Sequence, residues 1–161
     1  MKTMMMLLTT ALVVAFAAGC GDGEKNNDYV INGENAKVKW YLNLDEAAKV
    51  AKKENKPLMV LFTGSDWCPW CIKLHNEILS QPEFETFAAA ELVPVYLDFP
   101  NSKPQTDAER AANQAAASKF GIRGYPTIVF LSPDGKELAR TGYQRMSAGQ
   151  YADYVKQLIK Q

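Results

Sequence analysis

The sequence predicts an α/β domain in which a mixed central sheet of four to five strands is flanked by helices. In the first part of the domain, strand-like and helical segments alternate, and strands joined through helices usually run parallel. Near the C-terminus, two strand-like segments follow each other across a turn at 132–135, which predicts an antiparallel hairpin. A sheet that contains both arrangements is mixed.

Five segments have the length and apolar composition of strands, and helical segments or turn residues separate them. The predicted strands are 38–42, 57–62, 92–99, 127–131 and 136–143. Helices are expected from Asn43, from Cys68, over about 82–90, over about 106–120, and after the hairpin. The last helix carries a core-facing stripe at positions i, i+3, i+4, i+7 and i+8, formed by Tyr151, Tyr154, Val155, Leu158 and Ile159.

Capping residues mark several of the predicted helix ends. Asn43 is a plausible N-cap for the first helix, and Thr106 or Asp107 for the Ala-rich helix that Gly121 ends. The spacing in Ser80-Gln81-Pro82-Glu83 is that of a capping box and predicts another helix start.

Composition limits the classes of protein to consider. A chain of 161 residues with 47% hydrophobic residues is expected to form one compact domain. Lys plus Arg and Asp plus Glu number 18 each, so the net charge gives no reason to expect a nucleic acid partner.

The N-terminal segment has the features of an export signal. A basic start precedes an apolar stretch from Met4 to Ala18, and small residues lie just before Cys20. This end resembles a bacterial lipoprotein signal, although Ala17 stands where that pattern prefers Leu. We therefore expect a signal peptide at 1–19, lipidation of Cys20 and an exported, membrane-anchored lipoprotein facing the periplasm; the alternative is an ordinary signal that leaves Cys20 free in a soluble periplasmic or secreted protein.

The residues after the signal divide into two parts. Residues 20–37 are rich in Gly, Asn, Asp, Glu and Lys without sustained periodicity, and they are expected to form a flexible tether. The folded domain is expected to cover 38–161.

Two cysteines lie where a strand passes into a helix, in Trp67-Cys68-Pro69-Trp70-Cys71. A helix start leaves backbone N–H groups unpaired and carries the positive end of the helix dipole, which stabilises a thiolate. Cysteines in such motifs can have a pKa of about 3.5–7.5 instead of about 8.5. The pair therefore predicts a dithiol–disulfide exchange centre.

Two cysteines at this spacing also occur in structural disulfides, zinc sites and haem attachment sites. A structural disulfide across so short a loop restricts the unfolded chain little. A zinc site needs four ligands, so a carboxylate would have to join Cys68, Cys71 and His75. A c-type haem needs His directly after the second cysteine, where Ile72 stands.

From about Val38 to Lys160 the chain resembles thioredoxin-fold proteins. The resemblance rests on the strand that leads into the cysteine motif, on Phe120-Gly121-Ile122-Arg123-Gly124-Tyr125-Pro126-Thr127, and on the final hairpin and helix. It implies roles for six residues: Cys68 as the exposed attacking thiolate, Cys71 as the buried resolving thiol, Pro126 as a cis-proline facing them, and Trp67, Trp70 and Tyr125 in substrate contact or shielding of the sulfurs.

The chain also departs from ordinary thioredoxin. Phe62 stands where that family has a buried Asp that helps the buried thiol exchange its proton, and Pro94 falls near the position of the partner Lys. Asp66, the nearest acid in sequence, could serve instead, although a turn Asp is more often a cap or solvated. His75 lies one helical turn after Cys71 and could tune that thiol, although a lone His is more often a surface residue.

The resemblance implies a thiol–disulfide oxidoreductase that needs no cofactor and no metal. Its expected partners are protein thiols and disulfides and an unidentified membrane or periplasmic electron donor, and reduction or isomerisation is expected rather than oxidation. The alternatives are a non-catalytic lipoprotein that binds a metal through Cys68, Cys71 and His75, and an interaction domain with a static disulfide.

Overall fold

The computed structural model describes residues 28–29 and 38–160. The predicted signal peptide at 1–19, the lipidation site Cys20 and most of the predicted tether lie outside the described residues. The tether prediction meets the described part only at 28–29, which form the short strand β1 (Asp28–Tyr29).

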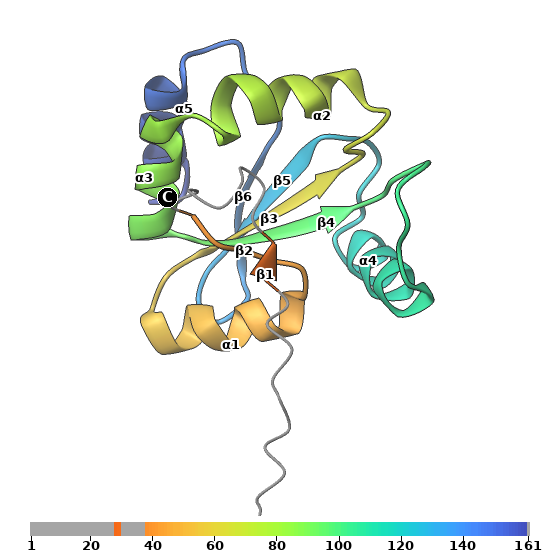
Figure 1. Cartoon of the computed structure of the whole chain (residues 1–161). Helices are drawn as coiled ribbons and strands as arrows, with labels where there is room; N and C mark the ends of the chain where they lie inside the picture. Colours follow the sequence, from red (N-terminus) through yellow and green to blue (C-terminus); the bar gives the residue numbers. More distant parts are fainter. Residues whose placement is uncertain (1–27, 30–37, 161) are drawn as a thin grey trace, which may run out of the picture.

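The centre of the fold is a mixed sheet, with strands in the order β1-β2-β4-β3-β5-β6 (Figure 1). In this sheet β2, β4 and β3 run parallel to one another, while β1, β5 and β6 are antiparallel to their neighbours. The strands after β1 are β2 (Trp40–Tyr41), β3 (Leu58–Thr63), β4 (Val93–Asp98), β5 (Thr127–Leu131) and β6 (Glu137–Thr141). These five correspond to the predicted strands, and the predicted mixed sheet flanked by helices is confirmed.

Helices cover both faces of the sheet (Figure 1). On one face lie α1 (Leu44–Glu54) and α4 (Asp107–Lys119). The other face carries α2 (Pro69–Leu74), the π-helix η1 (His75–Leu79), α3 (Pro82–Glu91) and α5 (Ala148–Leu158).

The central strand β3 is buried on both sides, as its continuous apolar sequence predicts. Because side chains alternate along a strand, Met59 and Leu61 pack into the core under α3 and α5, while Val60 and Phe62 pack into the core under α1 and α4. This strand therefore packs against both helical layers. Its C-terminal end leads into the turn before the cysteine motif.

Local signals placed most helix starts correctly. Asn43 caps α1 through hydrogen bonds from the backbone N–H groups of Asp45 and Glu46. Thr106 caps α4 in a reciprocal capping box with Glu109. Gly121, after α4, has a φ of 60°, a left-handed conformation that glycine adopts without strain.

The capping box predicted at Ser80 is wrong. The N-cap of α3 is Gln81, which makes no capping hydrogen bond with its side chain. Ser80 instead ends the π-helix before it, and its hydroxyl donates to the backbone carbonyl of Asn76. The wider turn of η1 places the end of one helix where the sequence suggested the start of the next.

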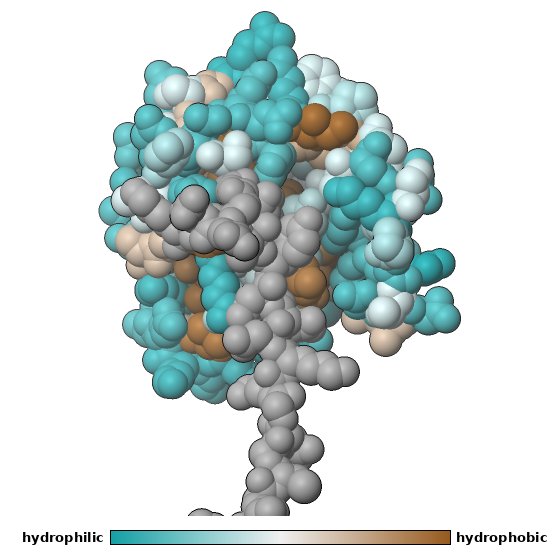
Figure 2. Space-filling view, in the orientation of Figure 1, coloured by the Kyte–Doolittle hydropathy of each residue, from teal (hydrophilic) through white to brown (hydrophobic). Residues whose placement is uncertain are grey.

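The described surface is mostly hydrophilic in the view of Figure 2, and its hydrophobic patches are small and separate. Among the described residues, the large hydrophobic side chains with substantial exposure are Trp67, Trp70 and Ile72, all in or beside the cysteine motif. No helix within 38–160 has the length and apolar character needed to cross a membrane.

Candidate active site

The cysteine motif occupies the junction between β3 and α2. Cys68 is the N-cap of α2, with extended backbone, and Pro69 takes the first helical position, where its missing N–H costs nothing. The backbone N–H of Cys71 donates to Cys68 Sγ across 3.2 Å. An N-cap is normally an oxygen acceptor, so the sulfur of Cys68 has the place of a capping group in this helix.

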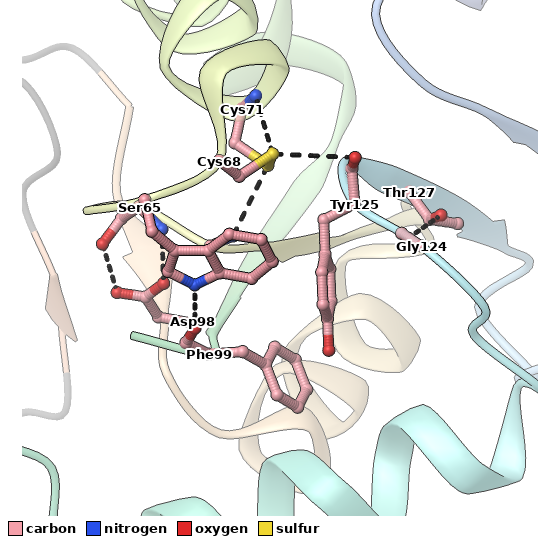
Figure 3. Close-up of a disulfide and its surroundings, with 10 residues drawn as sticks. Ser65, Cys68, Cys71, Asp98, Phe99, Gly124, Tyr125 and Thr127 are labelled. Atoms are coloured by element: carbon pink, nitrogen blue, oxygen red, sulfur yellow. Dashed lines mark hydrogen bonds between the residues drawn. A yellow bond between two sulfur atoms is a disulfide. The ribbon is translucent and has the colours of Figure 1, made fainter. Parts of the chain in front are cut away.

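Cys68 and Cys71 form a disulfide, with their Cα atoms 5.2 Å apart. The backbone N–H of Gly64 lies 3.5 Å from Cys71 Sγ and donates to it (Figure 3). The exposed fractions of Cys68 and Cys71 are 4% and 3%. In the disulfide form, Cys68 is therefore not the exposed member of the pair that the resemblance implies, because its sulfur lies against the loop before β5.

That loop contains the Tyr125–Pro126 peptide bond, which is cis. The carbonyl oxygen of Tyr125 lies 3.6 Å from Cys68 Sγ (Figure 3). The cis conformation and the position opposite Cys68 agree with what the resemblance implies for Pro126. Gly142, after β6, passes close to the same loop, and a Cβ at this glycine would lie 2.9 Å from the Pro126 carbonyl oxygen.

Trp67 is held on the surface beside the disulfide. Its indole N–H donates to the carbonyl of Phe99 across 2.8 Å. The indole ring also makes an edge-to-face contact with the ring of Tyr125. Tyr125 also packs on the ring of Phe99, and partial burial raises the pKa of its hydroxyl. The side chain of Trp67 keeps 43% of its surface exposed, which leaves it accessible to a partner.

Trp70 belongs to a different group of side chains. Its ring packs against Tyr143, with centroids 5.5 Å apart, and the ammonium of Lys73 lies over both rings. The Tyr143 hydroxyl donates to the Glu77 carboxylate, and this hydrogen bond is the main cause of its raised pKa. Sequence reasoning missed Tyr143 and Lys73. Tyr143 lies far from Trp70 in the sequence, and the only sequence signal for this group was the i,i+4 spacing of Lys73 and Glu77.

Neither Phe62 nor Asp66 places a carboxylate beside Cys71. Phe62 is fully buried against Phe99 and Phe120, so no carboxylate occupies its place. The carboxylate of Asp66 accepts hydrogen bonds from the backbone N–H groups of residues 101–103, which lower its pKa. Asp66 therefore holds a loop and does not face Cys71.

His75 lies on the cavity that borders Cys71. This cavity measures about 140 Å³. Its lining consists of Leu61, Thr63, Ser65, Cys71, Ile72, His75, Leu79, Tyr96 and Lys103. Burial, and secondarily the positive charge of Lys103, lower the pKa of His75 below 6.5. Lys103 and Ser65 had no signal in the sequence, because they reach the cavity only through the loop after β4 and the turn after β3.

The site contains the parts that thiol–disulfide exchange requires. When the disulfide is reduced, the Cys71 N–H and the start of α2 favour a thiolate at Cys68, and Cys71 lies close enough to displace a captured group. Within residues 38–160, no group of three or more His, Cys, Asp or Glu side chains could hold a metal ion.

Comparisons with known proteins point to the same chemistry. The family model described as a thioredoxin-like domain matches residues 44–159. The chain is 38% identical over 125 residues to the disulfide bond reductase DsbH of Chlamydia pneumoniae, an alignment that covers 78% of this chain and 75% of that protein. It is 34% identical to the thioredoxin-related protein DsbJ of the same organism, where the alignment covers 69% of this chain but only 32% of that longer protein.

A solved structure, DsbH oxidoreductase, has a similar fold. It superposes with a TM-score of 0.73 at 37% sequence identity, over 76% of this chain and 85% of that one. On its sequence, its fold and its paired cysteines, the chain belongs to the thioredoxin-like family and is a thiol–disulfide oxidoreductase.

Proposed function

We propose that the protein reduces or isomerises disulfides in other proteins, with Cys68 as the attacking and Cys71 as the resolving sulfur. The observation that carries the site assignment is the Cys68 sulfur at the N-cap of α2, opposite the cis Tyr125–Pro126 bond. The direction is supported by the similarity to a protein named as a disulfide bond reductase.

The exchange proceeds in two displacement steps. The Cys68 thiolate attacks one sulfur of the substrate disulfide, a mixed disulfide forms, and the other substrate sulfur leaves as a thiolate that takes a proton. Cys71, as a thiolate, then attacks Cys68 Sγ; the Cys68–Cys71 bond forms and the second substrate thiol is released. Two electrons pass from the dithiol of the protein to the substrate disulfide.

The substrate is expected to lie along the loop that faces Cys68. The backbone of Tyr125, next to the cis bond, can pair with an extended segment, as the family resemblance implies. Trp67 and Trp70 are exposed on the motif itself and offer apolar contacts to such a segment. We assign substrate contact to Trp67, Trp70 and Tyr125.

We further propose that the domain works outside the cytoplasm, anchored through lipid on Cys20. The N-terminal sequence, with a basic start, an apolar stretch and small residues before Cys20, supports this location. In an oxidising compartment a reductant must be regenerated, so a membrane or periplasmic thiol donor completes the cycle.

Insulin reduction with dithiothreitol as the electron source tests the assignment. Cys68→Ser should abolish the activity. In the absence of dithiothreitol, Cys71→Ala should accumulate mixed disulfides, because no thiol displaces the captured substrate. Activity that survives Cys68→Ser would contradict the proposal.

The direction is tested by the reduction potential of the pair. A reductant should lie near thioredoxin, at about −270 mV, and an oxidant nearer −120 mV. A value close to −120 mV would exclude the reductive role while leaving the exchange chemistry intact.

A further inference from the structure

A cavity lies beside Cys71, the resolving thiol, which must lose its proton before it can attack. The cavity volume of about 140 Å³ leaves room for water next to the sulfur. Its lining combines apolar side chains from β3, α2 and η1 with the polar side chains of Thr63, Ser65, His75, Tyr96 and Lys103. A polar cavity that ends on a buried thiol provides a path for a proton.

We propose that His75 accepts the proton of the Cys71 thiol across this cavity in the resolving step. The proposal rests on the exchange reaction described above and assigns the proton acceptor for it. His75 would thus serve in place of a carboxylate on β3, where the buried Phe62 cannot act as a base.

The helix geometry places His75 on the same cavity as Cys71. The backbone N–H of His75 donates to the carbonyl oxygens of Cys71 and Ile72, and the helix then widens into the five-residue π-helix η1. Short π-helical turns within helices occur frequently at functional sites. Here the widening begins at the histidine, one turn after Cys71.

Among the charged and titratable groups around the cavity, Lys103 is the one that favours the neutral form of His75. Lys103 reaches the cavity from the loop after β4, and its ammonium donates to Ser65 Oγ across 2.8 Å. Ser65 in turn donates to both carboxylate oxygens of Asp98, through its N–H at 3.0 Å and its hydroxyl at 2.5 Å. From β4, the Tyr96 phenol also lines the cavity.

Of the charged and titratable groups Asp98, Lys103 and His75, His75 is the one available to accept a proton. The Asp98 carboxylate is occupied by Ser65, as Figure 3 shows, and the Lys103 ammonium is a donor without a lone pair. Burial and the charge of Lys103 both lower the pKa of His75, so its imidazole is an acceptor near pH 7.

The Cys71 S–H bond breaks and its proton passes to the imidazole, directly or through one water, which leaves a Cys71 thiolate and an imidazolium. The thiolate attacks Cys68 Sγ of the mixed disulfide, the Cys68–Cys71 bond forms, and the substrate sulfur leaves with its electron pair. The imidazolium then loses its proton to solvent.

The test measures the two displacement steps separately in the full chain, with a fluorescent peptide disulfide as the probe. In His75→Gln, formation of the mixed disulfide should proceed at the original rate. Its resolution should slow by roughly 10- to 100-fold, at or under the lower limit of about 100-fold that a general base typically contributes. The pH profile of the resolving step should lose its inflection below 6.5, the ordinary histidine pKa.

Lys103→Met is a second variant that retains the histidine. Removing the positive charge should raise the pKa of His75, so the inflection of the resolving step should move to higher pH. Asn76→Ala is the matched control, because this exposed residue follows His75 in η1 and does not line the cavity. It should leave both steps and the profile unchanged.

The outcomes separate this proposal from the function it rests on. Failure of the exchange function would appear as activity that persists in Cys68→Ser. The role of His75 is overturned if His75→Gln resolves the mixed disulfide at the original rate with the same profile, or if it slows both steps equally. It is also overturned if Lys103→Met leaves the inflection in place.

Discussion

At the scale of single residues, the site depends on how closely the chain packs before Cys68. A Cβ added at Gly64 would lie 2.5 Å from the indole ring of Trp67. The same glycine donates its N–H to Cys71 Sγ. Gly64 therefore allows Trp67 to lie over the turn and Cys71 to receive a backbone hydrogen bond.

Gly64→Ala should displace the indole and weaken its hydrogen bond to the Phe99 carbonyl. We expect a loss of about 1–3 kcal/mol in the free energy of unfolding, as for other overpacked sites, with a change in tryptophan fluorescence. Urea denaturation measures the loss. Gly124→Ala is the control, because a Cβ at that glycine meets nothing within 4 Å and the backbone φ is not positive; equal losses in the two variants would refute the steric explanation.

At the scale of the elements, the helices of this fold begin in different ways. At α4, the Thr106 hydroxyl accepts from the Glu109 N–H, and the Glu109 carboxylate accepts from the Thr106 N–H. At α3, Gln81 makes no side-chain capping bond, and Pro82 begins the helix instead. The stability of α4 therefore depends on its cap more than that of α3 does.

Thr106→Ala should lower the free energy of unfolding by about 1 kcal/mol. The Glu109 N–H loses its acceptor, and the Glu109 carboxylate, which accepts from the Thr106 N–H, loses the hydroxyl that also donates to it. Gln81→Ala removes no capping bond of α3 and only the exposed hydrogen bond from Gln81 Nε2 to the Asn76 carbonyl, so it should cost less than Thr106→Ala. Both values come from denaturant titration. A larger loss at Gln81 than at Thr106 would contradict this reading of the two helix starts.

At the scale of the whole molecule, one sheet separates two cores. Val155 of α5 lies in the core on the face of α2, α3 and α5, while Val95 of β4 lies in the core on the face of α1 and α4. Both side chains are fully buried. Because β3 and β5 contribute to both cores, the domain should unfold as one unit.

Val155→Ala and Val95→Ala should each cost on the order of 2 kcal/mol, and the double variant should show the sum within about 0.5 kcal/mol. A single cooperative transition should persist in circular dichroism and in tryptophan fluorescence. Two separate transitions would show that the two cores unfold independently, against the prediction of one unit. A strongly non-additive sum would show that Val155 and Val95 are energetically coupled through the sheet.

Much of this fold could be predicted from short-range patterns. The apolar run of β3, the proline after Cys68 and the cap at Asn43 act over a few residues, so the sequence shows them directly. The prediction at Ser80 was wrong, because the π-helix before it changed the register of the helix end. A pattern that assumes 3.6 residues per turn does not detect such a widening.

The sequence by itself determined the strand–helix junction that places Cys68 at an N-cap with Cys71 one turn further, because those contacts form within one continuous segment. Only the tertiary structure decided what surrounds the two sulfurs. Tyr143 meets Trp70, the loop at Tyr125 faces Cys68, and Lys103 joins His75 at the cavity of Cys71. These partners are brought together by the order of strands in the sheet, and that order arises from packing between segments far apart in the chain.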